Sequence, residues 1–432
     1  MSLKVLSLNG LSLSGLSLYN VRRMFCLAVS ASLFFGCGSS DVNDQDADPI
    51  AETFPIAYIK RPLPVDDDGE RVSDDLTELL NFQPGAALYV RSSASPGGSE
   101  QNITARAFEE DALYDVKDVE ASFDGSQLIF AMRAPEIEDV DDEDQPRWNI
   151  WEYDVPTDTL TRIITSDITA EDGHDIAPHY LPTGDIIFSS TRQRAAKAIL
   201  LDESKPQFEA QDEDRDEPAF LLHVINGVSG AIKQVSFNQS HDTDPTVLSD
   251  GKVVFTRWDN MGGRNTMNLY RMNPDGTELE LLYGLHSHNT GTDESAIQFD
   301  HPREMPDGRI MVIMRPNVST DFAGDIVAID VDNYIDNEMP VASNLGATTS
   351  AQESLTLGVI TTDNSISSAG RYSTVFPLDD GSGRIIVGWN QCRLIVIEDD
   401  VETIRPCTDA LLAEADPVEA APLSVLKVYD PS

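Results

Sequence analysis

The chain of 432 residues is long enough for one large domain or two medium ones, and its 41% hydrophobic and 7% aromatic content is ordinary for a globular protein. With 74 acidic against 30 basic residues, its formal net charge of -44 at pH 7 repels nucleic acid, so we expect no nucleic-acid partner. The excess acid fits two interpretations, which are a solvated surface on an exported protein and the binding of divalent cations.

The N-terminal region carries the pattern of an export signal. Arg22 and Arg23 precede an apolar run from Met24 to Phe35, which is too short to span a bilayer as a permanent helix. Gly36 and Cys37 follow, as at the cleavage site of a bacterial lipoprotein, and the next residues are polar. These features predict cleavage before Cys37 and a lipid on its side chain.

This pattern predicts three regions along the chain. Residues 1–36 form a signal segment, in which the repetitive first twenty residues read as an overlong start, and residues 37–54 form a flexible linker behind the lipid on Cys37. The remaining residues, 55–432, form the folded part. We therefore expect an exported protein of a Gram-negative bacterium, held in the periplasm or at the outer membrane, with the membrane as a partner through the lipid anchor. The alternative is a cytosolic protein with a frayed apolar N-terminus.

A strand, turn and strand phrase recurs along the folded part. Each copy joins a short strand to a second strand rich in Ile, Val and Phe through an Asp-Gly or Thr-Gly turn, where glycine tolerates positive φ. The turn glycines Gly125, Gly184, Gly251 and Gly308 are spaced by 59, 67 and 57 residues. The five copies are Val119–Arg133, Ala177–Arg192, Asp244–Asp259, His301–Arg315 and Ser373–Asn390.

Further strands follow each copy, so that a repeat has four antiparallel strands, the content of a propeller blade. Before the first copy, Ile56–Pro62 and Ala86–Phe108 match the second to fourth strands of one more blade. No sustained helical periodicity appears, so helices should be few. We predict an all-β, six-bladed propeller, with five clear blades and a partial N-terminal one. Val425–Pro431 either supplies the innermost strand of that partial blade or forms a third strand of the last blade.

Two cysteines, Cys392 and Cys407, belong to the folded part and lie 15 positions apart. In an oxidising compartment they most simply form a disulfide, worth about 3 kcal/mol in the loop-entropy model. A zinc pair is the alternative, but no Cys-x-x-Cys spacing and no nearby histidine accompanies them.

The blades resemble TolB-type repeats, and the span from Phe54 to Tyr429 more closely resembles the middle domain of hydrazine synthase alpha subunits and of bacterial lipoproteins that share it. The motifs behind this resemblance include AYIKRP, GAALYVRSSASPG, HYLPTGDIIFSSTRQ, HPREMPDGRI and WNQCRL. The resemblance implies a propeller and a protein partner in the cell envelope.

The resemblance does not carry hydrazine synthesis with it. That family attaches c-type haem through Cys-x-x-Cys-His, and this sequence contains no such motif, so we expect no covalent haem. Family members also continue beyond the segment that matches Val425–Pro431, so the chain can be a C-terminally truncated version of a longer protein.

Histidine and aspartate recur near the start of the innermost strands. His174 and His241 each lie ten residues before a turn glycine and each precedes an aspartate, while His301 aligns with Asp244. Equivalent positions in successive blades face one mouth of the channel, and imidazole and carboxylate suit zinc, manganese or iron. The alternative is that these side chains cap free backbone groups at the strand starts. The candidate ligands are His174, Asp175, His241, Asp242, Asp244 and His301.

The sequence contains no G-x-S-x-G, no H-E-x-x-H and no phosphate-binding glycine loop in a suitable context. Four arginines end the second strands and are expected to pair with acidic residues between blades. We therefore expect an envelope propeller that binds a protein or small ligand and is not an enzyme by itself. The alternative is a metal- or cofactor-dependent redox subunit of a periplasmic complex. The four arginines are Arg133, Arg192, Arg257 and Arg315.

Overall fold

The computed structural model describes residues 2–7 and residues 54–431. The second range lacks residues 66–70, 73–74, 96, 142–143, 207, 212–217, 318–321, 379 and 399–400. The apolar core of the expected export signal and the predicted lipid attachment site Cys37 lie outside these ranges. Within them, no helix is long and apolar enough to cross a membrane.

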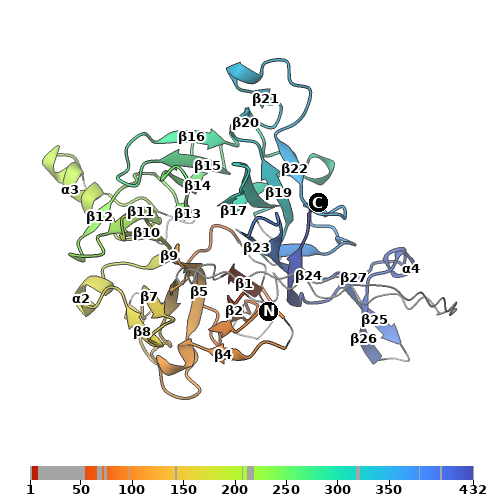
Figure 1. Cartoon of the computed structure of the whole chain (residues 1–432), viewed down its shortest axis with the longest axis horizontal. Coiled ribbons are helices and arrows are strands. Elements are labelled where there is room, and N and C mark those ends of the chain that lie inside the picture. The colour runs from red at the N-terminus through yellow and green to blue at the C-terminus, as the bar shows by residue number, and fades with distance from the viewer. Residues whose placement is uncertain are drawn as a thin grey trace, which may run out of the picture.

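Six antiparallel sheets surround a central axis as the blades of a propeller (Figure 1). Within each blade the strands follow the sequence from the axis outward. The first three blades are β1 (Ser2–Ser7), β2 (Ile56–Arg61), β3 (Ala87–Arg91) and β4 (Glu100–Asn102); β5 (Asp115–Ala121), β6 (Gln127–Arg133), β7 (Trp148–Asp154) and β8 (Thr159–Arg162); and β9 (Asp175–Tyr180), β10 (Ile186–Ser190), β11 (Leu221–Ile225) and β12 (Ile232–Gln234).

The other three blades complete the circle. Their innermost strands, with those of the first three, contact one another in the closed order β1, β5, β9, β13, β17, β23 and back to β1. The strands of these three blades are β13 (Asp242–Val247), β14 (Val253–Asp259), β15 (Thr266–Met272) and β16 (Glu280–Tyr283); β17 (Gln298–Glu304), β18 (Ile310–Arg315), β19 (Asp325–Ile329) and β22 (Gln352–Ser354); and β23 (Arg371–Pro377), β24 (Ile385–Asn390) and β28 (Ser424–Tyr429).

The predicted all-β propeller class is confirmed, and the described helices are few and short: α2 (Asp167–Ala170), α3 (Arg194–Asp202) and α4 (Asp409–Leu412). The predicted turns are also present. Gly125, Gly184, Gly251 and Gly308 have φ between +69° and +87°, the left-handed region that other residues adopt at a cost. Each of these glycines donates its N–H to the carbonyl three residues earlier, at 2.8–2.9 Å, which closes the hairpin.

The two ends of the chain lie in different blades of the propeller. β1 pairs antiparallel with the whole of β2, so Ser2–Ser7 supplies the innermost strand of the first blade. These residues fall in the region whose repetitive sequence reads as an overlong start. β28 pairs with β24, so the C-terminal segment is the third strand of the last blade and does not close the first. The last blade has three strands in the described part of the chain, as the third-strand alternative for this segment implies.

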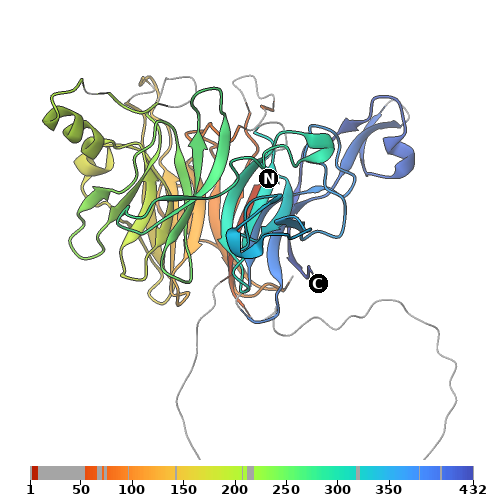
Figure 2. The same ribbon diagram turned by 90° about the horizontal axis from the view of Figure 1, so that it is seen from above.

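A small sheet is inserted between β24 and β28 and projects from the side of the propeller (Figure 2). It contains β25 (Arg393–Glu398), β26 (Val401–Pro406) and β27 (Val418–Glu419). The predicted disulfide between Cys392 and Cys407 is confirmed, with 5.4 Å between the Cα atoms, and it joins the base of the β25–β26 hairpin. A covalent link here compensates for the small apolar core of so short a sheet.

The main core lies between neighbouring blades. The second strands place Phe130, Phe188, Phe255 and Val312 at its centre, and none of these side chains is exposed. One cluster joins Val254 and Leu269 of the fourth blade to residues of the fifth, including Val312. Because each blade buries its faces against its neighbours, the closed ring is the unit of stability.

Asp325, at the start of β19, gives this fold a pH-dependent contribution. Burial raises its pKa to about 6, and the Thr356 hydroxyl donates to its Oδ1 at 2.9 Å. This pKa exceeds that of an aspartate in the unfolded chain, which is about 3.9. The stability that the protonated Asp325 contributes is therefore fully present below about pH 3.9 and is lost as the pH rises through the folded pKa of about 6.

We expect Asp325→Asn, relative to the wild type, to gain stability between about pH 4 and pH 8, by up to about 3 kcal/mol. Urea unfolding at both pH values measures the difference, and Asp250→Asn at an exposed turn controls for the loss of one negative charge. A difference from wild type that is equal at the two pH values would contradict this role for Asp325.

Candidate ligand site in the central channel

The innermost strands of four blades each contain a β-bulge with one left-handed residue. Asp118, Ala177, Asp244 and His301 have φ of +58°, +48°, +50° and +51°. At each of them the pairing register shifts, so that two residues lie opposite one on the neighbouring strand. All four stand seven residues before a turn glycine. Proline, which has no N–H to donate to the ladder, follows the left-handed residue in three of the blades, as Pro178, Pro245 and Pro302.

The bulges turn these residues into the channel. A cavity of about 100 Å³ there is lined by Asp118, Ala177, Asp244, His301 and, from the sixth blade, Ser373. The ring is partly self-supporting, since the Asp118 carboxylate accepts the Ala177 N–H of the next blade at 3.0 Å. Left-handed non-glycine residues cost on the order of 1–3 kcal/mol each and persist where the surrounding structure fixes them.

Leu76 and Leu79, in the connection between β2 and β3, cover one end of the channel. Leu76 and Leu79 line the same cavity, and the Leu76 N–H donates to the carbonyl of Asn317 at 3.0 Å. Leu76 also packs against Trp258 and Met267, and the Leu79 carbonyl accepts from the Lys117 ammonium. These contacts reach from the first blade to the second, fourth and fifth. The cavity is therefore roofed by protein at this end.

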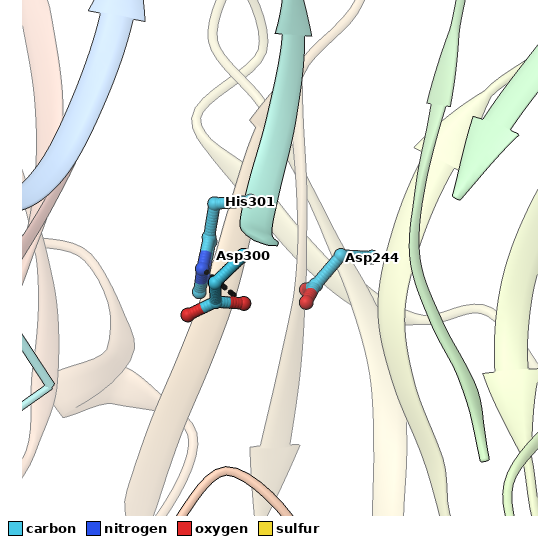
Figure 3. A group of neighbouring side chains, drawn as sticks. All are labelled: Asp244, Asp300 and His301. Atoms are coloured by element: carbon cyan, nitrogen blue, oxygen red, sulfur yellow. Dashed lines mark ion pairs between the residues drawn. The ribbon is translucent and has the colours of Figure 1, made fainter. Parts of the chain in front are cut away.

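Asp244, Asp300 and His301 form the group in the described part of the chain that is best arranged to hold a metal ion. One ligand atom from each lies within 4.8 Å of the others (Figure 3). His301 Nδ1 is 2.9 Å from Asp300 Oδ1, and the fully buried Arg315 places Nε 3.6 Å from Asp300 Oδ2. Asp244 reaches the pair from the neighbouring blade. One imidazole and two carboxylates suit a divalent cation.

His174 and His241 hold equivalent positions, as the repeat alignment predicted, but they do not converge on the channel. His174 Nδ1 accepts the N–H of Trp148 at 3.2 Å, and His241 Nδ1 accepts the N–H of Phe220 at 3.0 Å. Each imidazole thus satisfies a backbone group where the third strand of the preceding blade begins. Burial lowers the pKa of His174 well below its ordinary value, so the ring is a neutral acceptor. For this pair the capping alternative describes the contacts.

Asp175 and Asp242 also face away from the cavity-lining set. Asp242 makes a two-pronged ion pair with Arg257, at 2.7 and 2.8 Å, and Asp175 pairs with Arg192 in the same way. Both pairs lie within one blade, so for Arg192 and Arg257 the expectation of pairing between blades is wrong. The reason is the antiparallel register, which sets Asp242 directly opposite Arg257.

Sequence reasoning missed Asp300 and a second ring of channel residues. Glu120, His179 and Arg303 each stand five residues before a turn glycine, two positions beyond the bulge. Asp300 precedes His301 and carries no repeat signal of its own. The proline that follows three of the bulges is the sequence signal by which both rings could have been aligned.

The capping role of His241 gives a direct prediction. We expect His241→Ala to leave the buried N–H of Phe220 unsatisfied and to lower the free energy of unfolding by about 1–3 kcal/mol. Thermal or urea unfolding measures this loss, with the exposed His286→Ala as the matched control. Wild-type stability in His241→Ala would show that the bond to Phe220 contributes nothing.

Comparison with known proteins supports the architecture. No family model and no curated protein matches the chain. Among solved structures, hydrazine synthase of Kuenenia stuttgartiensis superposes with a TM-score of 0.53 at 16% identity, over 88% of this chain and 47% of that chain. The protein is a β-propeller.

This propeller spans about half the length of the hydrazine synthase chain. TolB of Acinetobacter baumannii is also similar, with a TM-score of 0.35 at 15% identity, over 65% of this chain and 58% of that one. At such identities the likeness concerns the fold alone.

Proposed function

We propose that this propeller is a ligand-binding module of the cell envelope and that its central channel holds a divalent cation at Asp244, Asp300 and His301. The observation that carries the proposal is the approach of three ligand atoms from two blades to within 4.8 Å. Two of the residues, Asp244 and His301, occupy left-handed bulge positions. Strained backbone of this kind clusters at binding and catalytic sites.

The surroundings support a cation at this place. The Leu76 and Leu79 roof lowers access of water, which strengthens charge interactions inside the cavity. Arg315 balances part of the charge on Asp300, so the cluster tolerates burial before a cation arrives. The formal net charge of -44 draws cations toward the protein.

Binding alone accounts for this arrangement, and a redox role is the alternative. Such a role needs a metal that changes its oxidation state, whereas a scaffold or binding module works equally well with calcium, zinc or manganese. The identity of the bound metal therefore separates the two functions.

We expect the purified wild type to bind a divalent metal and Asp244→Asn and His301→Ala to weaken that binding at least about tenfold. Elemental analysis of the protein as purified and calorimetric titration with Mn²⁺, Zn²⁺ and Ca²⁺ measure it. Asp250→Asn is the charge-matched control. No binding of any of these ions by the wild type, or an equal loss in Asp250→Asn, would contradict the site, and stoichiometric iron would favour the redox function.

We also propose that the protein is exported and anchored through a lipid on Cys37, on the sequence pattern around Gly36 and Cys37. Cleavage before Cys37 would remove β1 from the first blade, so the mass of the mature chain is informative. We expect the mature chain to begin at a lipid-modified Cys37. We expect the Cys37→Ser variant to be found in the soluble fraction and not with the membranes. A folded wild-type chain that keeps residues 2–7 and takes up no labelled fatty acid would contradict the anchor.

A further inference from the structure

The other mouth of the channel contains a second and larger cavity, which the cation proposal does not use. Its volume is about 610 Å³, and it lies at the hairpin-turn ends of the inner strands. Its lining combines aromatic, charged and hydroxyl side chains. These include Phe123 and Phe376 on the wall, Thr246 and Ser249 beside them, and Glu120, His179 and Arg303 at the base.

An ion pair across the channel forms the base of this cavity. Arg303 on β17 contacts the carboxylate of Glu120 on β5. These strands stand three positions apart in the ring of six, so the two side chains meet from opposite blades. Their exposed side-chain fractions are only 18% and 8%, so the pair is shielded from bulk water. It turns this mouth of the channel into a cup with a polar floor.

His179 adds an acceptor to that floor. Its Nδ1 lies 2.9 Å from the Tyr180 carbonyl, which can only accept, so Nδ1 carries the proton. Burial lowers the pKa of His179, so the ring is neutral and Nε2 holds a lone pair. Nε2 faces Glu120 Oε1 at 3.9 Å. A ligand group with an O–H or N–H hydrogen that sits between these two acceptor atoms can donate to either of them.

The charged side chains of the cup restrict which class of ligand can carry that donor group. Three carboxylates, those of Glu120, Glu304 and Asp307, line the cavity against one guanidinium and disfavour an anion. At the floor itself, Arg303 already neutralises Glu120, so that spot offers no unbalanced negative charge to a cation. A hydroxyl group fits, because it donates to His179 or Glu120 and accepts from Arg303. Several donors and acceptors lie together on the floor, so a ligand with several hydroxyls satisfies it best.

The wall favours a ring-shaped ligand with an apolar face. Phe123 lies in the β5–β6 turn at the rim and is 63% exposed, so its ring is open to a ligand that enters the cavity. Phe376 lies beside the Arg303 guanidinium, whose carbon is 5.6 Å from the ring centre, and this contact helps to fix Arg303 in the floor. Aromatic walls above a floor of mixed donors and acceptors match the two faces of a pyranose.

We propose that this cup binds a neutral sugar, with one ring face on Phe123 and the hydroxyls on Glu120, His179 and Arg303. The proposal is independent of the cation site, which lies on the other side of the Glu120–Arg303 pair and uses different residues.

Titration of the full chain by isothermal calorimetry and ligand-observed NMR tests it, with glucose, galactose, N-acetylglucosamine, cellobiose and chitobiose as probes. We expect saturable binding of at least one of them. Phe123→Ala should weaken it about tenfold, the loss of one stacking contact, while Phe208→Ala, at an equally exposed phenylalanine, should not change it.

Glu120→Gln provides a second test that keeps the size of the side chain. We expect it to weaken sugar binding while the variant, checked by its circular dichroism, stays folded. If it does not fold, Phe123→Ala alone decides, because Phe123 is exposed and outside the core. The proposal is overturned if none of the five sugars binds saturably, if Phe123→Ala binds them as well as the wild type, or if methylammonium or acetate binds while the sugars do not.

Discussion

One left-handed residue in the innermost strand of four successive blades decides which side chains reach the channel. The bulge breaks the regular alternation of side-chain directions along the strand, so that the bulged residue lines the central channel. The bulged residues are Asp118, Ala177, Asp244 and His301. The next channel residues, two positions on, then form a separate ring that includes Glu120 and Arg303. Both proposed sites depend on this repeated distortion, and the packing of neighbouring blades against one another keeps it in place.

The groups that hold the blades together are distinct from those that face the ligand cavities. The Asp242–Arg257 pair joins two strands of one blade, and His241 satisfies a backbone N–H of the blade before it. Removing one partner of such a buried pair or buried acceptor lowers stability, so the contacts of these residues are structural. Histidine followed by aspartate is therefore a structural pattern in this protein, although its composition suits a metal.

The sequence was sufficient for the fold and for part of the site. Period-two strands joined by turns at Gly125, Gly184, Gly251 and Gly308 predicted the blades, because both patterns are local. The grouping of Asp244 with His301 also followed from the repeat. The prediction that His174 and His241 face the channel was wrong. A one-residue bulge follows each of them in the innermost strand and changes which side of the strand the residues before and after it face. The pairing of β1 with β2 was also missed, because 48 residues separate these strands and no local pattern links them.

The central claim is that the bulges bring Asp244, Asp300 and His301 together around a cation inside the channel. Anomalous X-ray scattering from crystals soaked in Mn²⁺ tests it most directly, because it locates the ion without assuming its ligands. The account predicts a strong peak between these three side chains, and its loss in Asp244→Asn crystals. Manganese found only on exposed acidic loops, with no peak in the channel, would contradict it.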